Sequence, residues 1–170
     1  RKRTALGTVP RGGTVLSRPA QNPGREEARA YLQKRGVSGQ TVTRFGLGYS
    51  PNRWTALLDV MTAKGYTKEE LLEAGLLSQN RDKGTLYDRF RNRLMFPIID
   101  VRGNVIGFGG RVMDDSTPKY LNSPETIIFN KRRNLFAMNV VKKSKREFII
   151  LTEGYMDAIA LHQYGFDCAV

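Results

Sequence analysis

Segment 148–170 constrains the fold of this chain more than any other. It begins with Phe148–Leu151, a short apolar run that predicts a strand buried on both faces. Apolar residues at helical spacing follow, among them Met156 and Ile159, and Gly165 stands where a helix would end. A second apolar run completes the order strand, helix, strand. This order predicts a parallel βαβ unit, the building block of α/β folds.

A carboxylate, Glu153, directly follows the first predicted strand of this unit. In open parallel sheets, ligands bind at the carboxyl ends of the strands, which favours a functional role for Glu153. The alternative is a solvated carboxylate that the helix dipole stabilises near a helix start. These residues alone leave both interpretations open.

Charge narrows the class of partner. Lys and Arg total 28 against 16 Asp and Glu, giving a formal net charge of +12 and a pI near 10.1. Such a balance predicts a polyanionic partner or an anionic membrane surface. No apolar run approaches the ~18 residues that cross a bilayer, and no apolar core follows the basic residues 1–3, so neither a span nor a secretory signal is expected. The single cysteine, Cys168, excludes an intramolecular disulfide and suits a cytoplasmic protein. A polyanion is therefore expected as the partner, and a membrane is not.

Composition divides the chain into three parts. Residues 1–24 are rich in Gly and Pro and carry five Lys or Arg, which predicts a flexible basic linker. Residues 25–146 combine helical and strand patterns and predict a mixed α+β subdomain. Residues 147–170 hold the βαβ unit. The predicted fold class is therefore α/β.

Several elements of 25–146 have local signals. Helices are expected at 25–35 and 54–64, after the capping residue Ser38, and after a capping box that opens at Thr67. Strands 94–99 and 105–108 flank a turn and predict a hairpin. Glycines at 107, 109 and 110 leave the second strand bare, which is usual where another group approaches closely.

Most of the excess positive charge lies between residues 81 and 146. Arg89, Arg91 and Arg93 alternate, so a strand would place all three on one face. Their spacing of about 7 Å would match the phosphates of an extended single strand. The alternative is a solvated edge that discourages sheet aggregation.

Residues 118–126 predict an irregular binding loop. Lys119 can contact a phosphate, Tyr120 can stack on a base or ribose, and Asn122 can donate and accept hydrogen bonds. A further basic cluster begins at Lys131.

Four motifs occur in an order and spacing that resembles the bacterial replicative primase family, the DnaG type. They are YDRFRNRLMFPI (87–98), GNVIGFGGRV (103–112), PKYLNSPET (118–126) and EGYMD (153–157). The resemblance runs from about residue 26 to residue 170 and implies a fragment of the family's RNA-polymerase core. In that core, a mixed N-terminal subdomain packs beside a TOPRIM domain with a Rossmann-like parallel sheet. The predicted βαβ unit corresponds to the start of TOPRIM.

The resemblance implies synthesis of short RNA primers on a single-stranded DNA template from ribonucleoside triphosphates, with Mg²⁺ or Mn²⁺ as cofactor. It assigns catalytic roles to Glu153, also a metal ligand, and to Asp157. Nucleic-acid or nucleotide contacts are implied at Arg35, Arg89, Arg91, Arg93, Arg111, Lys119, Tyr120, Asn122 and Lys131.

Other parts of the family's proteins are expected to lie outside this chain. They include a zinc-binding domain, a C-terminal domain for the replicative helicase, and a TOPRIM Asp-x-Asp pair that holds metal. The chain alone is therefore expected to be inactive. The resemblance also implies that the protein acts in the bacterial cytoplasm, at the replication fork. One alternative is a single-stranded nucleic-acid-binding module without catalysis. Another TOPRIM enzyme, a topoisomerase or nuclease, is disfavoured because motifs 87–98 and 118–126 resemble primase.

Overall fold

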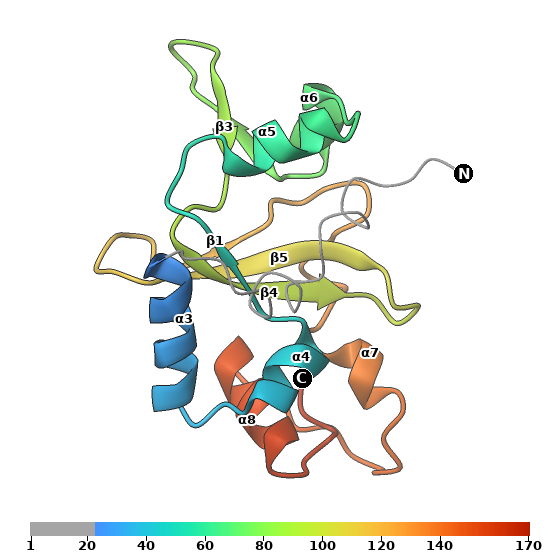
Figure 1. Cartoon of the computed structure of the whole chain (residues 1–170). Helices are drawn as coiled ribbons and strands as arrows, with labels where there is room; N and C mark the ends of the chain where they lie inside the picture. The colour runs from blue at the N-terminus through green and yellow to red at the C-terminus, as the bar shows by residue number, and fades with distance from the viewer. Residues whose placement is uncertain (1–22) are drawn as a thin grey trace.

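The computed structural model describes residues 23–170, which form a central antiparallel sheet with helices on both faces (Figure 1). The helices are α3 (Pro23–Lys34), α4 (Gly39–Phe45), α5 (Ala56–Ala63), α6 (Lys68–Glu73), α7 (Met138–Val141) and α8 (Tyr155–Gln163). The strands are β1 (Gly48–Ser50), β2 (Leu77–Gln79), β3 (Leu86–Asp88), β4 (Arg93–Ile99), β5 (Val105–Val112) and β6 (Tyr120–Asn122).

Short-range signals correctly predict the starts of α4 and α6 and the end of α3. Ser38 caps α4, its side chain accepting a hydrogen bond from the Thr41 backbone N–H at 3.1 Å. Thr67 and Glu70 form the predicted capping box of α6. Gly36 follows α3 with a φ of +71°, a conformation that glycine adopts without strain.

The sheet has strand order β1-β4-β5-β6, with every neighbour antiparallel. Its centre is the predicted hairpin of β4 and β5, in which Phe96 faces Gly109. On its other side, Gly109 pairs with Asn122 of β6. Residues 120–122 therefore form a strand, and the prediction that 118–126 is irregular throughout is wrong there. The polar residues of this segment do not predict a strand, because β6 forms only through its pairing with β5.

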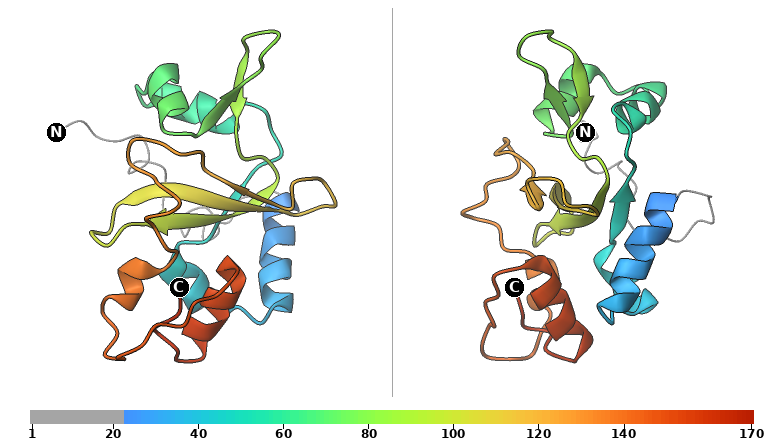
Figure 2. Two further views of the ribbon diagram at one scale, coloured as in Figure 1. Left: turned by 180° about the vertical axis from the view of Figure 1, so that it is seen from behind. Right: turned by 90° about the vertical axis from the view of Figure 1, so that its left-hand side faces the viewer.

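Two apolar clusters cover the two faces of the sheet (Figures 1 and 2). Side chains of β4 alternate between them, because Leu94 and Phe96 join one cluster and Met95 the other. The cluster below the sheet in Figure 1 consists of Ala28, Leu32, Val37, Phe45, Leu47, Tyr49, Leu94, Phe96, Ala137 and Ile159. The cluster above it consists of Leu58, Met61, Leu71, Leu76, Leu77, Phe90, Val105 and Phe108.

The bare backbone of β5 is occupied by side chains of the same chain. A Cβ added at Gly109 would lie 2.7 Å from Cζ of Tyr155, the first residue of α8. The Tyr155 ring also stacks on Phe96, with centroids 5.1 Å apart. The glycine thus allows α8 to pack directly against the sheet, and Ile159 of α8 lies in the core below it.

The predicted βαβ unit has the expected order and direction, but its first strand is not buried. Ile150 and Ala169 form a parallel bridge on either side of α8, and Ile150 N–H donates to the Cys168 carbonyl at 2.9 Å. Phe148 and Leu151 are exposed, at 55% and 74%. The apolar run predicted the extended conformation correctly, whereas burial depends on neighbours that residues 23–170 do not supply.

Two other predictions are corrected. Helix α5 begins at Ala56 rather than at 54, since Thr55 is its N-cap residue, and Trp54 lies outside it. The predicted linker 1–24 lies outside the described residues except for its last two, which belong to α3. Among the helices of residues 23–170, none is long and apolar enough to span a bilayer.

We predict that Gly109→Ala lowers the free energy of unfolding by about 1–3 kcal/mol, because its methyl group overlaps the Tyr155 ring. Gly39→Ala is the matched control, since a Cβ at Gly39 meets nothing within 4 Å. Urea unfolding of both variants measures the difference. Equal stability of the two variants would contradict this packing.

Candidate functional site

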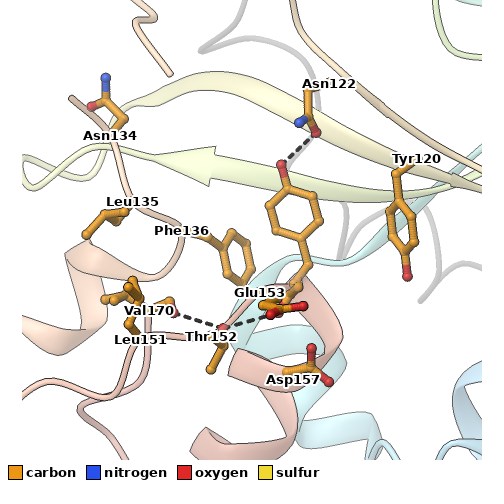
Figure 3. Close-up of a pocket in the computed structure, with 12 residues that line it drawn as sticks. Tyr120, Asn122, Asn134, Leu135, Phe136, Leu151, Thr152, Glu153, Asp157 and Val170 are labelled. Atoms are coloured by element: carbon orange, nitrogen blue, oxygen red, sulfur yellow. Dashed lines mark hydrogen bonds between the residues drawn. The ribbon is translucent and has the colours of Figure 1, made fainter. Parts of the chain in front are cut away.

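A pocket of about 520 Å³ opens between β6 and the start of α8 (Figure 3). Tyr120 and Asn122 line it from β6, while Glu153 and Asp157 line it from the α8 side. The other lining residues are Asn134, Leu135, Phe136, Leu151, Thr152, Gly154, Tyr155 and Val170. The fold therefore brings together four of the predicted site residues, from two segments far apart in the sequence.

Both predicted carboxylates lie at the N-terminus of α8. Glu153 directly precedes the N-cap residue Gly154, and Asp157 is in the first helical turn. Both side chains are exposed at the pocket. This position favours negative charge, because the first N–H groups of a helix have no partner within it.

Glu153 and Asp157 could supply some, but not all, of the ligands of a hard divalent cation. Mg²⁺ and Mn²⁺ prefer carboxylate, phosphate and water oxygens, and an exposed carboxylate pair offers two such donors. Within residues 23–170, no group of three or more His, Cys, Asp or Glu side chains could hold a metal ion. The remaining ligands would have to come from a nucleotide, from water or from other protein groups.

Asn122 is held through both of its oxygens. Its side-chain Oδ1 accepts a hydrogen bond from the Tyr155 hydroxyl at 2.7 Å. Its backbone carbonyl accepts from Arg89, with Nε at 3.3 Å and Nη2 at 3.1 Å. Arg89 thus fixes the strand end, and Tyr155 fixes the carboxamide.

Tyr155 itself is packed on several sides. Its ring stacks on Phe96 and meets the edge of Phe136, whose centroid is 4.9 Å away. Burial raises the pKa of Tyr155 to about 12. Its hydroxyl therefore keeps its proton, and its ability to donate to Asn122, throughout the neutral range.

The alternating arginines do not share a strand face, so that prediction is wrong. Strand β3 ends at Asp88 and β4 begins at Arg93, and between them Asn92 has a φ of +50°. The side chain of Arg93 is buried, and its Nη1 donates to the carbonyls of Gly110 at 3.1 Å and Pro118 at 3.0 Å. Alternation predicts a common face only within one continuous strand.

The three guanidinium groups nevertheless lie near one another. Burial lowers the pKa of Arg93, and the charges of Arg91 and Arg89 lower it further. Burial also lowers the pKa of Arg89. The cluster is therefore a partly buried concentration of positive charge rather than a regular row on a strand.

Arg91 lies against two aromatic rings. Its Cζ is 4.2 Å from the Trp54 ring centroid and 5.0 Å from that of Tyr87. Trp54 is 64% exposed, so an aromatic face next to a cation is open to solvent. The exposed ring of Trp54 is a functional candidate that the sequence did not indicate, because a helix was expected to begin at this residue. Thr55, a capping residue type, was the signal that the helix starts later.

A second pair of predicted cations flanks one tyrosine of α3. Cζ of Arg111 is 4.3 Å and Cζ of Arg35 is 5.5 Å from the centre of the Tyr31 ring. Lys119 and Lys131 are exposed on the segments before and after β6. None of the predicted cations lines the pocket itself, namely Arg35, Arg89, Arg91, Arg93, Arg111, Lys119 and Lys131.

The described residues combine a carboxylate pair at a helix start with arginines that lie on aromatic rings, features that suit a domain that binds nucleotides or nucleic acid. A family model described as the N-terminal domain of the DNA primase catalytic core matches residues 17–142. The chain belongs to this DNA primase family.

Individual relatives agree with this assignment. The chain is 54% identical over 145 residues to a DNA primase of Clostridium acetobutylicum, covering 85% of the chain and 24% of that relative. The Escherichia coli primase catalytic core superposes with a TM-score of 0.85 at 43% identity, covering 97% of the chain and 52% of that structure. A DnaG primase catalytic domain bound to single-stranded DNA superposes with a TM-score of 0.81 at 45% identity, covering 93% and 50%. The chain spans about a quarter of the length of the curated relatives it matches.

We predict that the free energy of unfolding falls as the pH rises from 10 to 12. Tyr155 titrates near 12 in the folded chain but near 10 when unfolded, so in this interval the folded state binds more protons and loses stability with rising pH. Tyr155→Phe should remove about 2 kcal/mol of this decline. Urea unfolding across the interval measures it, with Tyr164→Phe as an exposed control on the same helical segment. An unchanged slope in Tyr155→Phe would contradict the prediction.

Proposed function

We propose that this chain is part of a DNA primase, which synthesises short RNA primers on single-stranded DNA from ribonucleoside triphosphates. The observation that carries the proposal is the pocket that joins Tyr120 and Asn122 of β6 to Glu153 and Asp157 at α8. Membership of the primase family supports it. A similar catalytic domain described as bound to single-stranded DNA supports the nature of the template.

The pocket suits nucleotidyl transfer, in which a primer 3′-hydroxyl attacks the α-phosphate and pyrophosphate leaves. Tyr120 offers an exposed ring for a base or ribose, and Asn122 offers hydrogen-bond donors to nucleotide oxygens. Glu153 and Asp157 would hold Mg²⁺ or Mn²⁺ together with nucleotide oxygens. Bound there, the ion would supply charge neutralisation and activation of the attacking oxygen. Lys119, on the segment leading into β6, would hold phosphates in line.

The cations divide into two roles in this proposal. Arg35, Arg91, Arg111, Lys119 and Lys131 would contact nucleic acid, because their side chains reach the surface. Arg89 and Arg93 would position the others, since their guanidinium groups tie β6 and the segment before it to the sheet. The exposed ring of Trp54 would offer a stacking surface beside Arg91.

We propose that the whole protein binds its other partners through domains that lie outside this chain. A replicative helicase would bind through a C-terminal domain, and zinc would belong to a separate domain. The TOPRIM domain would be completed by the remaining strands and metal-binding carboxylates, and the protein would act in the bacterial cytoplasm. The alternative, a binding module without catalysis, is favoured because no group of three or more His, Cys, Asp or Glu side chains within residues 23–170 could hold a metal ion.

We predict that the chain binds single-stranded DNA with a steep salt dependence. Replacing Arg35, Arg91 and Lys119 together by alanine should weaken binding at least tenfold and flatten the slope of log K against log salt by about 2, because three phosphate contacts are lost. Fluorescence anisotropy with a labelled oligonucleotide across a salt series measures both.

The matched control removes three other exposed cations, Arg102, Lys143 and Lys145, which lie in the β4–β5 turn and just after α7. Thermal unfolding verifies that both triple variants are folded. Equal losses in the two variants would show that binding depends on net charge and not on the proposed surface.

We predict that the isolated chain makes no RNA primers, because Glu153 and Asp157 provide only part of a metal site. A primer-synthesis assay with Mg²⁺ or Mn²⁺, an oligonucleotide template and labelled ribonucleotides tests this. A metal-dependent product that Glu153→Gln abolishes would contradict the prediction and exclude the alternative of a module without catalysis.

A further inference from the structure

The carboxamide of Asn122 is anchored by a hydrogen bond to its oxygen. Its Oδ1 accepts a hydrogen bond from the Tyr155 hydroxyl, which Figure 3 marks by a dashed line. Within the described part of the chain, Nδ2 has no hydrogen-bond partner, although Asn122 lines the pocket. Both N–H donors of Nδ2 are therefore available to a bound molecule.

The hydroxyl that sets this orientation cannot move without moving the core. The Tyr155 ring lies between Phe96 and Phe136, and it covers the backbone of Gly109. Gly109 pairs with Asn122 in the sheet, so donor and acceptor both lie against β5. The hydrogen bond is thus fixed by packing at both ends.

We propose that Tyr155 is a positioning residue that holds the Asn122 carboxamide with its N–H donors directed at the triphosphate of a bound nucleotide. This inference rests on the proposed nucleotide function of the pocket. It assigns to Tyr155 a role separate from its packing: the hydroxyl anchors Oδ1, so that the nitrogen end of the carboxamide is left to meet the phosphate oxygens.

The opposite orientation would be unfavourable for a triphosphate. Turning the carboxamide by half a turn would present Oδ1 to the pocket, where its lone pairs would face negatively charged phosphate oxygens. Glu153 and Asp157 already line the same pocket, so a further exposed oxygen would add to the repulsion. Without the hydroxyl, the carboxamide loses the group that anchors Oδ1 and rotates more freely, so part of the donor capacity is lost.

The test uses Tyr155→Phe, which keeps the ring and removes only the hydroxyl. Tyr164→Phe is the matched control, because Tyr164 is exposed at the end of the same helix. Nuclear magnetic resonance spectra of ¹⁵N-labelled chain report on the side-chain amide of Asn122, which Asn122→Asp identifies by its disappearance. Tyr155→Phe should shift or broaden this amide signal, while Tyr164→Phe should leave it unchanged.

Binding measurements complete the test. Calorimetric titration with ATP, with inorganic tripolyphosphate and with adenosine, each in excess Mg²⁺, separates the triphosphate from the nucleoside. Tyr155→Phe should bind ATP and tripolyphosphate about fivefold more weakly, the effect of one neutral hydrogen bond, and adenosine equally well. Asn122→Asp should lose more, because it replaces the donors by a negative charge.

The outcomes distinguish this proposal from the function on which it rests. If the wild-type chain binds neither ATP nor tripolyphosphate, the nucleotide pocket and the positioning role are both overturned. If it binds them and Tyr155→Phe binds equally well with an unchanged Asn122 signal, only the positioning role is overturned. A loss confined to adenosine would overturn the assignment of the donors to the triphosphate.

Discussion

The contact between the Tyr155 ring and the bare backbone of β5 joins the two halves of this fold. A side chain larger than hydrogen at Gly109 would occupy the place of the ring, so α8 could not approach the sheet. The same contact determines where Glu153 and Asp157 lie, because Glu153 precedes the first turn of α8 and Asp157 is in it. It also places them across a pocket from Asn122, which pairs with Gly109. Packing and candidate chemistry therefore depend on one glycine.

The positive charge of the chain is organised by a different principle. Arg91, Arg93 and Arg111 are held by carbonyl groups and aromatic rings, whereas Arg53 and Arg146 form salt bridges with acidic side chains, to Asp59 and Asp167. Arg93 donates to backbone carbonyls, and Arg91 and Arg111 lie over the rings of Trp54 and Tyr31. Such contacts orient a guanidinium group without neutralising it. These guanidinium groups therefore have fixed positions and still carry the positive charge that attracts phosphates.

Short-range chemistry allowed much of the fold to be predicted. The caps at Ser38 and Thr67 act within four residues, and they appear as expected. Two predictions were wrong, namely that Phe148 is buried and that the alternating arginines share one strand face. Burial depends on neighbouring strands, and a shared face requires a continuous strand, which Asn92 interrupts. The prediction that Asn122 and Glu153 belong to one site rested on the family motifs that contain them, because no local pattern indicates which distant segments will meet.

The central claim is that 120–122 and 153–157 form one nucleotide pocket, and paramagnetic broadening by Mn²⁺ with ATP tests it most directly. In ¹H–¹⁵N spectra, the account predicts that the amides of both segments broaden together at low Mn²⁺ concentration, while those of α5 and α6 remain sharp. Broadening of 153–157 without 120–122, or broadening centred on another surface, would contradict it.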